Sequence, residues 1–260
     1  MSLKLIAALC IFVLTLVGGL IPLLTRTDSR KMMRFFYWGD CFAAGIFMGV
    51  GLIHLLPDAI TQFQVAYPAV QFPVIPTVCA ATLFFVHLLE QKGGCHMCHH
   101  GLAARAWLPL LLTGLLSTHA LVEGVALGIS ESTTRIALIF AAIFIHKWAE
   151  SFVLGLNFRH NELPFQMTLP ILVLFSSMTP LGIAGGAALD TLLSDHAIVL
   201  AQACISAIAA GTFIYVATLE PERAYPGRKP DDPHYSRFSG GGLLYFGLGI
   251  GLMGVVAGMI

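Results

Sequence analysis

The chain has 260 residues, of which 57% are hydrophobic and 11% charged, and its formal net charge is zero. Soluble domains carry roughly 25% charged residues, so this composition excludes an ordinary soluble domain and indicates an integral protein of the lipid bilayer. The neutral balance and the absence of a long basic run argue against nucleic acid as a partner.

Windows of about 20 apolar residues predict an all-α fold, a bundle of eight transmembrane helices. The first window has an apolar stretch too long for a typical signal peptide, and no A-x-A cleavage site follows it. We therefore interpret it as a spanning helix. Residues 1–260 are expected to form a single transmembrane domain, with cytosolic loops at about 92–106 and 220–239. The eight windows are 3–24, 40–60, 73–91, 107–129, 135–157, 168–190, 197–219 and 240–259.

Basic residues are concentrated in alternate loops. The loops after the first, third, fifth and seventh predicted helices hold eleven of them, whereas the other side has only Lys4 and Arg135. Because cytoplasmic loops carry an excess of Lys and Arg, these four loops are predicted to be cytoplasmic and both termini to lie outside. A plasma membrane or bacterial inner membrane fits this topology. The eleven residues are Arg26, Arg30, Lys31, Arg34, Lys92, Arg105, Arg159, Arg223, Arg228, Lys229 and Arg237.

Ionisable residues interrupt three of the predicted helices at a recurring spacing. The second contains "HLLPD" (54–58), the fourth "HALVEGVALGI" (119–129) and the fifth "HKWAESFVLGL" (146–156). In each, a carboxylate follows a histidine by four residues, which places both side chains on one helix face. Pro57 and Pro180 lie within predicted helices and are expected to kink them.

The link between the fourth and fifth helices, "SESTT" (130–134), is short, so these helices should be antiparallel neighbours. In a symmetric hairpin, His119 lies level with Glu150, and Glu123 lies level with His146. The result is a box of two imidazoles and two carboxylates near the bilayer midplane. Such groups bind zinc and related divalent cations, and a cation would offset the cost of burying the carboxylates.

Other interpretations of these residues remain open. Single intramembrane histidines or glutamates can be structural hydrogen-bonding residues. The box could also be the relay of a proton or organic-ion carrier. An intramembrane metallohydrolase is disfavoured, because the sequence has no His-Glu-x-x-His string and no G-x-S-x-G elbow.

Two cytosolic features could also contact a metal. Glu220, just before Pro221 at the inner end of the seventh helix, is either an exit contact or a solvated helix end. The segment "CHMCHH" (95–100) predicts a flexible metal acceptor or sensor, with a tolerated variable loop as the alternative. Its candidate ligands are Cys95, His96, Cys98, His99 and His100.

With these motifs in place, the sequence resembles the ZIP (Zrt/Irt-like) family of divalent metal transporters over essentially its whole length. The specific stretches are "HALVEGVALGI", "HKWAESFVLGL", "SMTPLGIAGGAAL" (177–189) and "AAGTFIYVATLE" (209–220), and they are most similar to the branch with His-Lys in the fifth helix. The resemblance implies uptake of zinc, or of iron, manganese or cadmium, into the cytoplasm. It also implies that His119, Glu123 and Glu150 bind the metal and that His146 is a ligand or a partner of one.

The sequence departs from family members that hold two metal ions. Where those members have Asn and Asp in the fourth and fifth helices, this chain has Ala120 and Lys147. An ammonium group at position 147 could take the space and charge of a second cation, which predicts a single-metal site. The expected path runs from Asp58 and His54 through the site to Glu220. The protein is then not an enzyme, the metal is cargo with no further cofactor, and a homodimer remains open.

Overall fold

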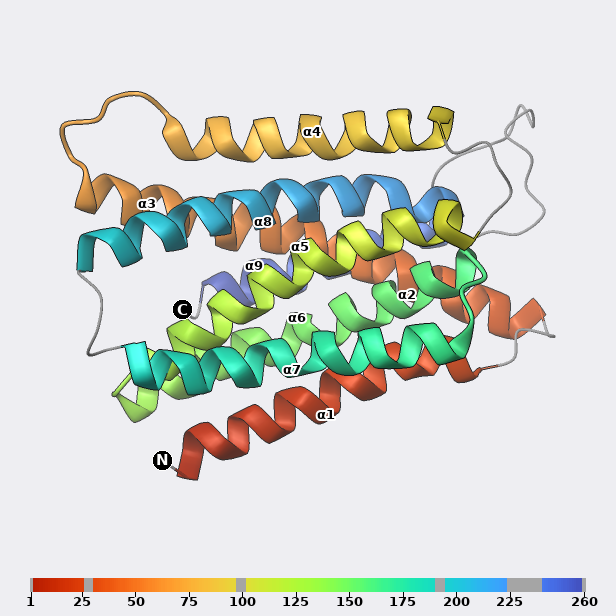
Figure 1. The fold of residues 1–260 in the computed structure, drawn as a ribbon, viewed down its shortest axis with the longest axis horizontal. Coiled ribbons are helices and arrows are strands. Elements are labelled where there is room, and N and C mark those ends of the chain that lie inside the picture. The colour runs from red at the N-terminus through yellow and green to blue at the C-terminus, as the bar shows by residue number, and fades with distance from the viewer. Residues whose placement is uncertain (1, 26–29, 97–101, 190–194, 224–239, 259–260) are drawn as a thin grey trace.

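A computed structural model of the protein describes residues 2–25, 30–96, 102–189, 195–223 and 240–258 (Figure 1). Every regular element in these ranges is a helix. The start of α1 and the end of α9 lie at the same end of the bundle. The elements are α1 (Ser2–Leu24), α2 (Arg30–Gly49), η1 (Val50–Leu55), α3 (Leu56–Ala66), α4 (Val74–His96), α5 (Leu102–Ile129), α6 (Thr133–His160), α7 (Phe165–Leu189), α8 (Asp195–Arg223) and α9 (Gly240–Ala257).

Within the described ranges, six helical stretches are long and apolar enough to cross a membrane. The apolar parts of α4 and α9, Val74–Leu89 and Gly241–Ala257, are shorter than this standard, so the eight-span topology remains a prediction. The six stretches are Leu3–Leu24, Arg34–Ala66, Arg105–Ile129, Thr133–His160, Phe165–Gly186 and Val199–Thr218.

The second predicted helix begins about ten residues earlier than expected. The sequence window starts at residue 40, whereas α2 starts at Arg30 and continues through η1 and α3 to Ala66. Phe36 and Tyr37 are buried in this added part, while Phe35 and Trp38 are exposed. Burial of one aromatic face stabilises these helical turns. The basic residues in the same turns lower the mean hydropathy, so the sequence window did not include them.

The helix widens into a π-helical turn just before Pro57, where the sequence predicts a kink. The N–H of Leu56 donates to the carbonyl of Gly51, five residues back, which makes Val50–Leu55 a π-helix. Proline cannot donate a hydrogen bond, and its ring crowds the carbonyl four residues back, so the regular α-helical pattern cannot continue through this point. A Cβ on Gly51 would lie 3.1 Å from the Ala210 carbonyl oxygen, which shows how closely this turn approaches α8.

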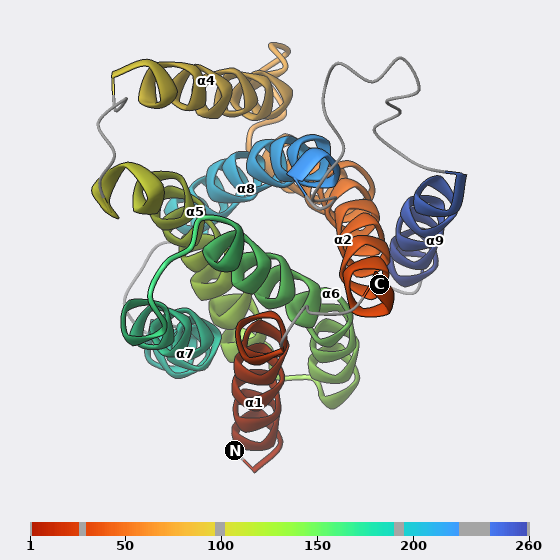
Figure 2. The ribbon, with the colours of Figure 1, turned by 90° about the vertical axis from the view of Figure 1, so that its right-hand side faces the viewer.

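The helices form two groups that meet around the centre of the bundle (Figure 2). In one group α5 packs along α7, and α1 packs against α6 and α7. In the other, α8 packs against α2, α3 and α4, and α9 packs against α2. The groups meet mainly where α6 contacts α2 and where α5 contacts α8. This division matters for the site, because the four candidate ligands all belong to the first group.

Glycines allow α5 and α7 to lie very close together. A Cβ on Gly124 or Gly182 would collide with backbone of the opposite helix, and Gly128 and Gly186 form a second such pair. Small residues at a helix crossing let membrane helices pack backbone to backbone. The α5–α7 pair is therefore expected to be a stiff support behind the ligands on α5.

Candidate metal site

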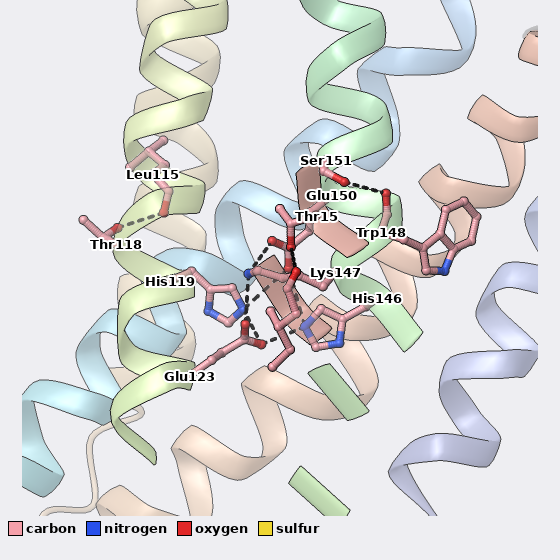
Figure 3. A network of polar contacts seen from close by, with 11 residues as sticks. Thr15, Leu115, Thr118, His119, Glu123, His146, Lys147, Trp148, Glu150 and Ser151 are labelled. Atoms are coloured by element: carbon pink, nitrogen blue, oxygen red, sulfur yellow. Dashed lines mark hydrogen bonds and ion pairs between the residues drawn. The ribbon is translucent and has the colours of Figure 1, made fainter. Parts of the chain in front are cut away.

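Helices α5 and α6 bring the four candidate ligands together near the middle of the bundle. Only residues 130–132 separate the two helices, which confirms the short link. His119 and Glu123 project from α5 toward His146 and Glu150 on α6 (Figure 3). Each of the four offers one ligand atom, and these atoms all lie within 4.8 Å of one another.

The four side chains approach one another both along each helix and across the hairpin, and the closest approach across it is between Glu123 and His146. Oε1 of Glu123 lies 2.9 Å from Nε2 of His119 and 2.7 Å from Nε2 of His146. Oε1 of Glu150 lies 3.5 Å from Nε2 of His146 and 4.0 Å from Nε2 of His119. The atoms that converge are thus two imidazole nitrogens and two carboxylate oxygens, a donor set suited to zinc and other borderline divalent cations.

Lys147 lies on the opposite side of the two carboxylates. Its Nζ is 2.7 Å from Oε2 of Glu150 and 3.1 Å from Oε2 of Glu123, and its side chain is 1% exposed. The ammonium also lies 5.5 Å from the ring centre of Phe175 on α7. Each carboxylate therefore directs one oxygen toward the imidazoles and the other toward an ammonium, as a carboxylate that bridges two cations does.

Several polar atoms of the cluster are buried without a hydrogen-bond partner among the described residues. They are both ring nitrogens of His119, Nδ1 of His146 and Oε1 of Glu150. Nε2 of His119 lies 2.9 Å from Oε1 of Glu123, but not at a hydrogen-bonding angle. Buried polar groups are nearly always satisfied, because each unsatisfied group costs about 1–3 kcal/mol. A cation bound between the imidazoles and the Oε1 atoms would satisfy two of these four atoms, Nε2 of His119 and Oε1 of Glu150.

The other predicted site residues lie apart from the cluster or beyond the described side chains. His54 of η1 and Asp58 of α3 form an ion pair of 2.9 Å, and the Asp58 side chain is about half exposed. Glu220 belongs to α8 and Cys95 and His96 to α4, but their side chains are not described. Cys98, His99 and His100 lie outside the described residues.

Two phenylalanines that adjoin the cluster were not predicted from the sequence patterns. Phe175 faces Lys147, and the ring of Phe213 on α8 meets the His119 imidazole edge to face, with centroids 5.0 Å apart and an interplanar angle of 83°. Aromatic residues are common in apolar helices, so periodicity carries no signal that these two adjoin a polar site.

Known proteins support the assignment that the motifs suggested. The sequence model of the ZIP zinc transporter family matches residues 1–101 and 94–257. Zinc transporter ZIP1 of Bos taurus is 29% identical over 266 residues, which cover 85% of this chain and 82% of that protein. Zinc transporter ZIP1 of Homo sapiens is 28% identical with the same coverage. Zinc transporter ZIP2 of Homo sapiens is 26% identical over 275 residues, covering 85% of this chain and 88% of the relative.

These matches confirm the resemblance drawn from the helix motifs, and they extend over nearly the whole chain. ZIP proteins are metal transporters and not enzymes, which removes the metallohydrolase alternative. The sequence matches and the apolar helices together identify an integral membrane protein. The chain belongs to the ZIP zinc transporter family.

Proposed function

We propose that the protein carries divalent transition-metal ions, zinc foremost, from outside into the cytoplasm through the cluster of His119, Glu123, His146 and Glu150. The observation that carries this proposal is the convergence of two Nε2 and two Oε1 atoms in a buried space between α5 and α6. The curated relatives are named as zinc transporters, which favours zinc as the cargo. Iron, manganese and cadmium remain candidate cargoes because imidazole and carboxylate ligands also accept them.

The site is proposed to hold one ion. Lys147 holds the Oε2 atoms of both glutamates, and a second cation would need these same oxygens. An ammonium is a point charge that cannot leave with the cargo. Lys147→Asp should therefore raise zinc bound at saturation from one to two ions per chain, measured by elemental analysis. Lys31→Asp, at an exposed position of α2, should remain at one.

The proposed path begins at the exposed Asp58 beside His54, reaches the central cluster and leaves past Glu220 toward the segment 95–100. Movement of the two helix groups against each other would expose the ligands to each side in turn. Both termini are proposed to face away from the cytoplasm, in a plasma membrane or bacterial inner membrane. The sequence contains no nucleotide-binding motif, so transport would run down an electrochemical gradient.

Zinc uptake into proteoliposomes tests the proposed function. His119→Ala combined with Glu150→Ala should reduce uptake to the level of empty vesicles, because half of the ligand set is lost. Glu131→Gln, in the exposed link between α5 and α6, should leave uptake unchanged. Uptake at the wild-type rate in the double variant would overturn the site assignment. Proton flux without zinc uptake or zinc binding would instead favour the proton carrier.

The outer end of the path has its own test. Asp58→Asn removes an exposed charge that attracts cations, so the KM for zinc should rise a few-fold at low ionic strength while Vmax is retained. Glu131→Gln removes a charge of the same sign elsewhere and should leave KM unchanged. Equal effects of both variants would indicate that Asp58 contributes only to the general surface charge.

A further inference from the structure

The orientation of the His119 ring has an unusual support. Histidines that bind metals nearly always donate a hydrogen bond from the second ring nitrogen to a carboxylate, carbonyl or water, which fixes the ring. Nδ1 of His119 is buried without such a partner among the described residues. The side chain is 2% exposed, so bulk water does not surround this nitrogen.

An aromatic contact is present at this ring instead. Phe213 of α8 packs edge to face against the imidazole at 5.0 Å, and Phe47 of α2 stacks on Phe213 at 5.3 Å with an interplanar angle of 17°. Phe47 and Phe213 are each 0% exposed. The three rings therefore form a close-packed series in which Phe47 limits the movement of Phe213, and Phe213 limits rotation of the His119 ring.

The two supports of His119 come from different helix groups. Its backbone belongs to α5, which is packed against α7 through the glycine pairs. Phe213 and Phe47 belong to α8 and α2, in the other group. A shift of α8 relative to α5 would withdraw the ring of Phe213 without moving the other three ligands, which are all on α5 and α6.

We infer that Phe213 is a positioning residue for the metal: its ring, packed against the imidazole, holds Nε2 of His119 toward Glu123, His146 and Glu150. Because this ring comes from the other helix group, movement between the groups loosens His119 and weakens metal binding. The inference rests on the proposed function, since it assigns a role at the same site. It adds a residue that neither binds the ion nor appears in the His-x-x-x-Glu pattern.

Cobalt binding to the purified full-length protein tests this role, because the visible absorption of Co²⁺ reports ligand number and geometry. Phe213→Leu, which removes the ring, should weaken Co²⁺ and zinc binding about three- to tenfold and reduce the intensity of the four-coordinate Co²⁺ spectrum. Phe213→Tyr retains the ring and should keep both properties close to wild type. In uptake assays, KM for zinc should rise in Phe213→Leu by the same factor as the dissociation constant.

Two further variants separate positioning from packing. Phe158→Leu makes the same change at a fully buried position further along α6 and should leave the Co²⁺ spectrum unchanged. Phe213→Met fills most of the ring's volume without an aromatic edge, and it should behave like Phe213→Leu even if the leucine variant folds poorly. An unaltered spectrum and affinity in Phe213→Leu and Phe213→Met would overturn the positioning role, as would equal losses in Phe213→Tyr. Wild-type protein that binds neither Co²⁺ nor zinc would overturn the proposed function itself.

Discussion

Replacement of Lys147 by leucine tests the balance of charge at the centre of the bundle. The ammonium is the cation closest to the Oε2 atoms of Glu123 and Glu150 among the described residues, at 3.1 and 2.7 Å. Removing one partner of a buried ion pair costs about 3–5 kcal/mol, because the remaining charge is left uncompensated. Leucine supplies similar apolar bulk and no ligand, so the buried Glu150 carboxylate and the largely buried Glu123 carboxylate would remain with no fixed counter-charge.

The substitution should destabilise the metal-free protein more than the zinc-bound protein, because a bound divalent ion neutralises the same carboxylates. Zinc should then bind the Lys147→Leu variant more tightly than the wild type. If even 1.4 kcal/mol of the lost stabilisation is recovered on binding, the dissociation constant falls tenfold. We therefore expect a decrease of tenfold or more, together with slower uptake at saturating zinc, because the ion leaves the site less readily.

Calorimetric zinc titration and zinc-dependent thermal unfolding of the purified protein measure this effect. Thermal stabilisation by zinc should be larger in Lys147→Leu than in the wild type. Lys31→Leu, at an exposed position, should match the wild type in both assays. Zinc affinity equal to or weaker than that of the wild type in Lys147→Leu would refute the view that the ammonium stands in for a second cation.

Two further predictions concern the framework around the site. Gly182→Ala places a Cβ against the Leu121 carbonyl and 2.9 Å from Cα of Gly124, so thermal stability should fall by an amount typical of overpacking, about 1–3 kcal/mol. Gly185→Ala, on the same helix with nothing within 4 Å, should be neutral or stabilising, and equal losses in both would contradict the close α5–α7 crossing. Arg159→Met removes two hydrogen bonds to the end of α1, of 2.8 and 2.7 Å, and should lower the unfolding temperature clearly. Arg105→Met breaks an exposed ion pair with Glu162, so a comparable decrease there would show that Arg159 has no special role.

The links of α1 to the site helices could not be inferred from sequence patterns. Lys4 near the start of α1 donates to the Gly128 carbonyl near the end of α5, at 2.6 Å. Arg159 near the end of α6 donates to Pro22 and Thr25 carbonyls at the end of α1. In each case a cation meets the unpaired carbonyls of a helix C-terminus, where a positive charge is favourable. Such contacts join residues more than a hundred positions apart, and no local pattern marks them.

Local regularities explain why much of the central cluster was predictable. A helix turns through a fixed angle per residue, so a spacing of four places His119 with Glu123, and His146 with Glu150, on one face. The short link then fixes which residues of the two helices lie level. The composition in turn indicates a membrane protein, and apolar windows of about 20 residues indicate helices, which satisfy their backbone hydrogen bonds within one segment. The motifs further identify the ZIP family.

Tertiary packing determined the contacts that helical periodicity does not specify. The rotation of α5 and α6 about their axes determines that Lys147 reaches the Oε2 atoms while the imidazoles face Oε1. The placement of α8 brings Phe213, about 90 residues along the chain, against His119. The sequence window also missed the start of α2, because burial against neighbouring helices, and not hydropathy, stabilises its first turns. Contacts between distant segments depend on how whole helices pack, and a sequence pattern that repeats every few residues does not encode that arrangement.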